Sequence, residues 1–156
     1  MNGINIVAYA PEYKTAFKAL NVTWIEQYFK MEATDYRILD YPETYILDKG
    51  GYIGVALLDE QVVGVCALLK MEHPKFDLEL AKMAVSTEMQ GMGVGKKLAK
   101  AMIAQAKNMG AKTLYLESST LLSPALHLYR TLGFVEIHGQ PSPYERSDIQ
   151  MRLDLD

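Results

Sequence analysis

Three glycines at alternate positions, Gly91, Gly93 and Gly95, most constrain how this chain can fold, because they separate a strand-like apolar pattern from a helical one. Glycine reaches backbone conformations with positive φ, and its lack of a Cβ lets a ligand approach the chain closely. A helix that starts after such a loop presents the free N–H groups of its first turn at the positive end of its dipole. The segment therefore predicts an anion site, most simply for phosphates.

Strands and helices alternate around this loop. Apolar periodicity predicts strands over residues 4–9, 52–58, 62–69, 76–85, 113–117, 134–137 and 148–153, and helices over 13–29, 35–39, 93–109 and 124–132. The strand–helix–strand order over 76–117 implies a right-handed crossover and a parallel strand pair in a mixed sheet. We therefore expect an α/β (α+β) fold, with residues 1–156 forming one domain.

The apolar pattern changes phase within the strand ahead of the glycine loop. Leu78 and Leu80 alternate with polar neighbours, whereas the next apolar positions are Met83 and Val85. A β-bulge near Ala81-Lys82 would return all four side chains to one face and bend the strand.

Composition excludes several classes of protein. The single cysteine, Cys66, excludes an internal disulfide framework, and with three scattered histidines no metal site is expected. A net charge of −3 argues against a general nucleic-acid binder. No apolar stretch approaches the ~18 residues of a membrane span, and the N-terminus lacks a signal-peptide pattern. We therefore expect a cytoplasmic protein without a membrane or nucleic-acid partner.

Two common phosphate loops do not fit the glycine segment. A dinucleotide fingerprint needs G-x-G-x-x-G, and a P-loop needs Ser or Thr after its lysine, which Lys96 lacks. Instead, Gln90-Gly91-Met92-Gly93-Val94-Gly95 matches the Q/R-x-x-G-x-G/A signature of the GNAT acetyltransferase superfamily, which the chain resembles. Residues 80–85 are similar to that family's bulged fourth strand. Residues 125–134 resemble its A-x-x-L-Y-x-x-x-G-F block, and residues 144–151 resemble its C-terminal strand.

The resemblance implies a mostly antiparallel central sheet of about seven strands, with helices on both faces and a splay between the fourth and fifth strands. In the family, that splay receives the pantetheine arm of acetyl-CoA, the co-substrate, and the glycine loop holds its pyrophosphate. The implied cofactor-binding residues are Met83, Ala84, Val85, Gln90, Gly91, Met92, Gly93, Val94, Gly95, Lys96, Lys97, Ser119 and Tyr129. Ser118-Ser119 replaces the Thr-Asn of many relatives, and a hydroxyl cannot copy both functions of an amide.

The implied reaction is transfer of an acetyl group to an amine of a small molecule or peptide, by direct attack in a ternary complex. Tyr129 stands at the family's general-acid position, and the Val85 N–H is the candidate for polarising the thioester carbonyl. Glu79 is the first candidate base and Glu117 the second, each acting directly or through a water. The alternatives are a non-catalytic acyl-CoA-binding sensor or interaction module on the same fold, and a dinucleotide oxidoreductase domain.

The sequence is compatible with two chemical classes of acceptor substrate. Aromatic walls with a carboxylate suit a cationic amine, whereas Arg146 suits a carboxylate on an amino-acid-like substrate. The candidate acceptor residues are Trp24, Tyr28, Phe29, Met31, Glu32, Tyr144 and Arg146. The resemblance is also compatible with a homodimer.

Overall fold

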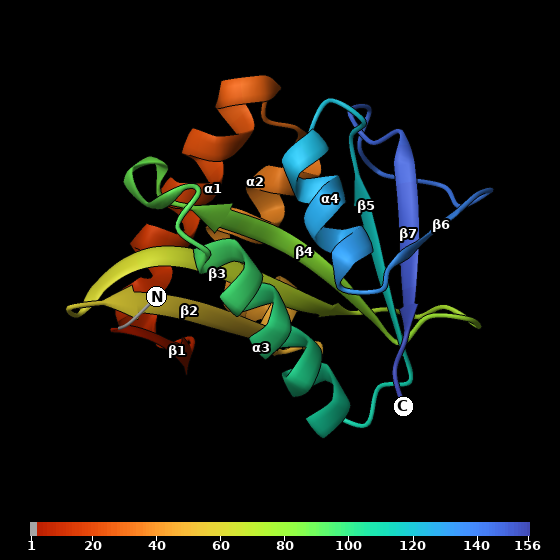
Figure 1. Cartoon of the computed structure of the whole chain (residues 1–156), viewed down its shortest axis with the longest axis horizontal. Helices are drawn as coiled ribbons and strands as arrows, with labels where there is room; N and C mark the ends of the chain where they lie inside the picture. Colours follow the sequence, from red (N-terminus) through yellow and green to blue (C-terminus); the bar gives the residue numbers. More distant parts are fainter. Residues whose placement is uncertain (1–2) are drawn as a thin grey trace.

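The computed structural model of the chain describes residues 3–156 and is shown in Figure 1. Its strands are β1 (Ile4–Ala8), β2 (Tyr52–Leu58), β3 (Gln61–Lys70), β4 (Leu78–Val85), β5 (Thr113–Ser118), β6 (Val135–Ile137) and β7 (Ile149–Asp154). Its helices are α1 (Lys14–Tyr28), α2 (Ala33–Asp40), α3 (Val94–Asn108) and α4 (Ser123–Thr131), with short turns η1 (Pro11–Tyr13), η2 (Glu43–Leu47) and η3 (Thr87–Met89). Within this described part, no helix is long and apolar enough to cross a membrane.

The strands form a seven-stranded sheet in the order β1-β2-β3-β4-β5-β7-β6, and β4 with β5 is the parallel pair among its described strands. Helices α3 and α4 cover one face of this sheet, and α1 and α2 lie behind the other (Figure 1). The expected mixed, mostly antiparallel sheet with helices on both faces is therefore confirmed.

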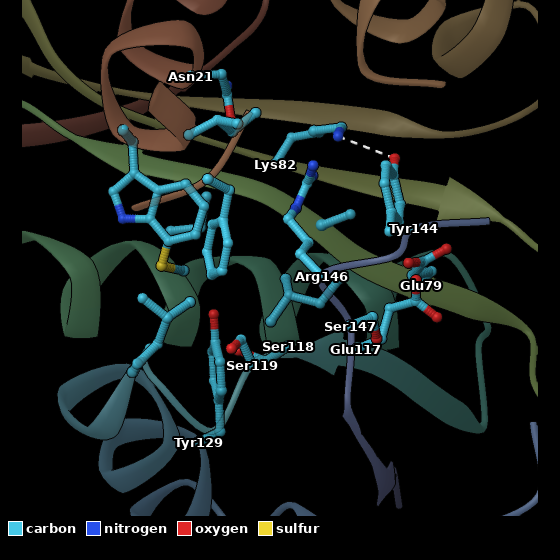
Figure 2. Close-up of a pocket in the computed structure, with 18 residues that line it drawn as sticks. Asn21, Glu79, Lys82, Glu117, Ser118, Ser119, Tyr129, Tyr144, Arg146 and Ser147 are labelled. Carbon is cyan, nitrogen blue, oxygen red and sulfur yellow. Dashed lines mark hydrogen bonds between the residues drawn. The ribbon is translucent and has the colours of Figure 1, made fainter. Parts of the chain in front are cut away.

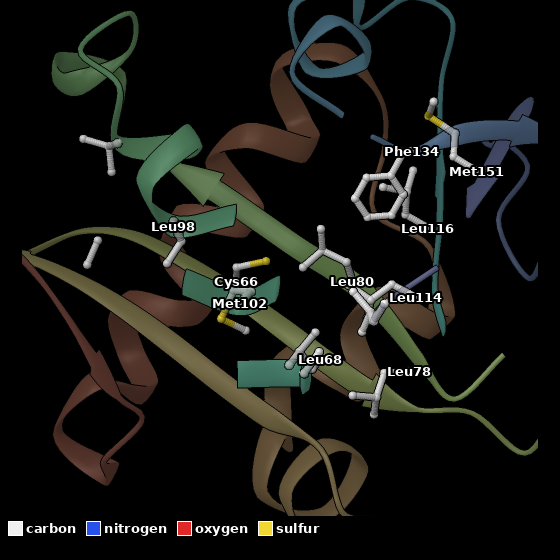
Figure 3. Packing of buried hydrophobic residues seen from close by; sticks show 14 of the residues in the cluster. Cys66, Leu68, Leu78, Leu80, Leu98, Met102, Leu114, Leu116, Phe134 and Met151 are labelled. Carbon is white, nitrogen blue, oxygen red and sulfur yellow. The ribbon is translucent and has the colours of Figure 1, made fainter. Parts of the chain in front are cut away.

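Each face of the sheet has its own apolar core. Leu98 and Met102 of α3 pack with Leu80 and Leu116 on one face (Figure 3). Phe17 and Ile25 of α1 pack with residues of β2 and β3 on the opposite face. The sheet is therefore buried on both faces where these helices pack.

A β-bulge lies in β4, as the phase change predicts. Val65 pairs with Ala84 and Ala67 pairs with Ala81, so two residues of β4 stand opposite Cys66 alone. One of them, Lys82, has a positive φ of 55°. The extra residue returns the following side chains to the α3 and α4 face, where Met83 packs against the core.

The parallel strands β4 and β5 separate soon after they meet. Their pairing consists of Leu78 with Leu114 and Glu79 with Tyr115. Beyond that point the two strands diverge, and α4 lies beside the opening (Figure 1). The separation leaves the facing backbone of β4 without a strand partner, which confirms the expected splay.

Candidate active site

The glycine loop is open to solvent. Gly91 and Gly93 have φ of 80° and 84°, and a Cβ at either position would meet no atom within 4 Å. Gly93 is the N-cap of α3, and no side chain of the described residues caps the first turn of that helix. The first turn of α3 thus has no side-chain cap among the described residues and adjoins an open loop, an arrangement suited to binding phosphate groups.

The side chains in and beside the loop differ in their exposure and contacts. The Gln90 side chain donates to the Val85 carbonyl at 3.5 Å, linking the loop to the end of β4. Met92 is 49% exposed and Lys96 is also exposed. Lys97, by contrast, donates from its Nζ to the Ile4 carbonyl at 2.6 Å, so the structure places this ammonium against β1.

A pocket with an empty volume of about 770 Å³, its open mouth included, occupies the splay (Figure 2). It is lined from both faces of the sheet, by residues of α1, β4, β5, α4 and the segment before β7. The lining residues are Asn21, Trp24, Ile25, Phe29, Glu79, Leu80, Ala81, Lys82, Met83, Glu117, Ser118, Ser119, Leu122, Ala125, Tyr129, Tyr144, Arg146 and Ser147.

Tyr129 enters the pocket from α4. Its ring packs edge-on against Phe134, with the centroids 5.9 Å apart, and its hydroxyl points toward the pocket beside Ser119 (Figure 2). Burial, followed by the neighbouring Cys66, raises the pKa of the Tyr129 phenol, so that it keeps its proton at neutral pH. Ser119 is buried, and its Oγ accepts a hydrogen bond from the Leu121 amide at 3.2 Å.

Glu79 and Glu117 lie where the strands separate. Burial, and then the carboxylate of Glu117, raises the pKa of Glu79 to about 8, although Lys82 acts in the opposite direction. Glu117 accepts hydrogen bonds from the hydroxyls of Tyr115 at 2.9 Å and Ser142 at 2.5 Å. The two candidate bases predicted from the sequence are therefore brought to one end of the pocket.

A buried ion network stands beside these carboxyls. Asp35 is fully buried, and its Oδ1 lies 2.6 Å from Lys82 Nζ. Arg146 donates two hydrogen bonds of 2.7 Å to the Asp35 carboxylate and a third, of 3.2 Å, to Glu32. Burial alone would raise the pKa of Asp35, but Arg146 and Lys82 outweigh it and lower the value to about 2.

Sequence reasoning did not identify this network. The sequence patterns place Asp35 in a predicted helix and Lys82 at the predicted bulge, and neither pattern indicates that the two side chains meet. One local signal was present: Glu32 and Asp35 form a capping box at the start of α2, in which Asp35 Oδ2 accepts from the Glu32 amide at 2.9 Å. Spacing within α2 could not show that distant cations complete the same carboxylate.

The predicted acceptor residues separate into two groups. Trp24, Phe29, Tyr144 and Arg146 line the pocket, as expected. Tyr28, Met31 and Glu32 are not among the lining residues, and Glu32 instead accepts from Arg146. Tyr28 is 47% exposed and packs against Trp24 on the outside of α1.

The sheet, the bulge, the splay and the open anion loop together define the fold of an acetyltransferase. The chain belongs to the Acetyltransferase (GNAT) family, whose model matches residues 15–134. Acetyl-CoA is the donor that GNAT acetyltransferases use, which agrees with the co-substrate expected from the sequence.

Two relatives illustrate the sequence similarity. N-acetyltransferase 8B of Rattus norvegicus is 34% identical over 98 residues, which cover 61% of this chain and 44% of the relative. Uncharacterized N-acetyltransferase YjgM of Escherichia coli (strain K12) is 38% identical over 78 residues, covering 49% of this chain and 47% of that protein. The chain thus aligns with less than half the length of either relative.

Solved structures share the whole fold. A GNAT-family acetyltransferase from Staphylococcus aureus Mu50 superposes with a TM-score of 0.87 at 23% identity, covering 98% of this chain and 99% of that one. The yncA protein of Salmonella typhimurium, solved with its cofactor acetyl-CoA, gives a TM-score of 0.77 at 18% identity, covering 99% and 95%. At these identities the likeness establishes the fold.

Proposed function

We propose that this chain is an N-acetyltransferase that moves the acetyl group of acetyl-CoA to an amine of a small molecule or peptide. One observation carries the proposal: the pocket in the splay is lined from both faces of the sheet. Tyr129 enters from α4, and Glu79 with Lys82 lies on the α1 and α2 side. A donor on one side can therefore meet an acceptor from the other.

The donor would be held by backbone groups. The open first turn of α3, from Val94 to Lys96, and the glycines before it supply amides for the pyrophosphate. The unpaired edge of β4 at Met83, Ala84 and Val85 would bond the pantetheine amides, as an added strand would. Ser119 and Tyr129 then lie at the thioester end of that path.

The chemistry follows from the groups that line the pocket. The amine nitrogen attacks the thioester carbonyl carbon, a C–N bond forms and the C–S bond breaks. The leaving thiolate takes the proton of the Tyr129 hydroxyl, which its raised pKa keeps in place until then. The proton released by the amine goes to the carboxylate of Glu79, with Glu117 as the second candidate, and solvent exchange restores both groups.

The test is a thiol-release assay with acetyl-CoA and a panel of amines, run on the wild type and on Tyr129→Phe. The variant should bind acetyl-CoA with unchanged affinity by calorimetry, yet lose about 10²–10⁴-fold in turnover. Tyr36→Phe, at an exposed position on α2, is the matched control and should turn over normally. Tight acetyl-CoA binding without acetylation of any amine would favour the acyl-CoA-binding module instead.

A cytoplasmic location is part of the same proposal. It is compatible with the single cysteine, Cys66, which has no partner in this sequence for an internal disulfide. Alkylation of this thiol in intact cells would be expected only after unfolding, because the side chain is fully buried.

A further inference from the structure

The cations that line the pocket are already paired within the protein. The side chains of Lys82 and Arg146 are only 5% and 15% exposed, and both bond to the buried carboxylate of Asp35. Arg146 also reaches Glu32 at 3.2 Å. Two positive charges are thus matched by two negative charges, so neither cation is left to neutralise an incoming anion.

The carboxyls that line the same pocket are not paired with cations. The Glu79 side chain makes no hydrogen bond or ion pair with any of residues 3–156, and among these residues the Glu117 carboxylate accepts only from the hydroxyls of Tyr115 and Ser142. Glu79 of β4 pairs with Tyr115 of β5 at the last paired position before the splay. Glu117 lies two residues after Tyr115 on β5, on the same face of the sheet. Figure 2 shows their carboxyl groups close together at one end of the pocket.

A second polar group in the pocket also lacks a partner. Among residues 3–156, Ser147 Oγ is the buried side-chain polar atom without any hydrogen bond. It lines the same pocket as the two carboxyls. A buried hydroxyl without a partner costs free energy, and a polar ligand would satisfy it.

We propose, on the basis of the proposed function, that the acceptor is an amine that enters as an ammonium ion and whose own carbon carries no carboxylate. The ammonium supplies a counter-ion for the Glu117 carboxylate and favours the ionised form of Glu79, which accepts the amine proton. A carboxylate on the same carbon would be brought next to Glu117 and to that ionised form of Glu79, where like charges repel. Trp24 and Phe29, also in the lining, provide an apolar and aromatic surface for the body of the amine.

The test compares amines with the amino acids that differ from them by one carboxylate: phenethylamine with phenylalanine, tyramine with tyrosine, and agmatine with arginine. Thiol release should favour the amine of each pair by at least about tenfold in kcat/KM. Glu117→Gln should reduce this preference severalfold, because it removes one of the two carboxyls. Glu136→Gln, at an exposed position on β6, should leave the preference unchanged.

Calorimetry of the CoA-bound protein with the same pairs separates this inference from the proposed function. Tighter binding of the amines without any turnover would contradict N-acetyl transfer but support the acceptor class. Equal or better binding and turnover of the amino acids would overturn the acceptor class and leave N-acetyl transfer standing. Preference for the amine in both readouts supports both.

Discussion

Asp35 Oδ1 accepts a hydrogen bond from Lys82 Nζ at 2.6 Å, so a buried carboxylate near the start of α2 is bonded to the positive-φ residue of the β4 bulge. Arg146, just before β7, donates to both oxygens of the same carboxylate. One side chain therefore joins a helix, the bulged strand and the segment that closes the pocket. We infer that Asp35 fixes the relative position of the elements that line the acceptor side.

Replacing Asp35 with asparagine should destabilise the fold by about 3–5 kcal/mol, because it leaves the buried Lys82 without a counter-ion and Arg146 with Glu32 alone. Urea unfolding at pH 7 measures this change as a lower midpoint. Asp40→Asn is the matched control: Asp40 pairs with Lys18 on the surface, and its loss should cost only about 0–1 kcal/mol. Equal costs for the two variants would contradict the role assigned to Asp35.

Replacing Gly93 with alanine should weaken acetyl-CoA binding by about tenfold or more, a loss of about 1.4 kcal/mol. Gly93 has a φ of 84°, and its missing Cβ opens onto the space where the pyrophosphate is proposed to bind. Gly110 has the same φ of 84° and equally open surroundings, at the far end of α3. Gly110→Ala should therefore cost a similar stability, roughly 1–2 kcal/mol, while leaving the calorimetric affinity for acetyl-CoA intact.

The rate of acetyl transfer should rise with pH through about 8. Burial and Glu117 raise the pKa of Glu79 to about 8, so the carboxylate that accepts the amine proton becomes populated only as the pH passes this value. A pH profile of kcat/KM with acceptors of different amine pKa separates this limb from titration of the acceptor. In Glu79→Gln the limb should vanish and the rate fall; a limb that persists unchanged would assign it to another group.

The same raised pKa predicts an effect on stability. Between the unfolded value near 4.5 and the folded value near 8, the folded state holds a proton on Glu79 that the unfolded state has released. Stability from this group therefore falls as pH rises across that window. Glu79→Gln should raise the melting temperature relative to wild type more at pH 8 than at pH 5, and a difference independent of pH would contradict this assignment.

The local features of the site could be predicted from the sequence. The break in apolar phase between Leu80 and Met83 located the bulge, because side chains alternate strictly along a strand. The glycine spacing predicted the open loop, because the ability to adopt a positive φ, seen at Gly91 and Gly93, depends on the residue type alone and not on distant contacts. Strand phase places Glu79 on the face opposite Leu78 and Leu80, and the family resemblance then makes it the first candidate base.

The ion network could not be predicted in the same way. Lys82 and Arg146 are 47 and 111 residues from Asp35 along the chain, and only the packing of α2 against the sheet brings them together. Lys97 illustrates the converse: its place beside the glycine loop suggested a phosphate contact, yet its ammonium reaches the carbonyl of Ile4. A long side chain on a helix can reach several partners, and spacing along the sequence does not show which of them it contacts.

The most direct test of the account is a crystal structure of the protein grown with acetyl-CoA. We predict that the pyrophosphate oxygens accept hydrogen bonds from amides of residues 91–96, and that the pantetheine arm occupies the gap between β4 and β5 with its thioester beside the Tyr129 hydroxyl. Density for acetyl-CoA elsewhere, with this loop and gap empty, would contradict the account.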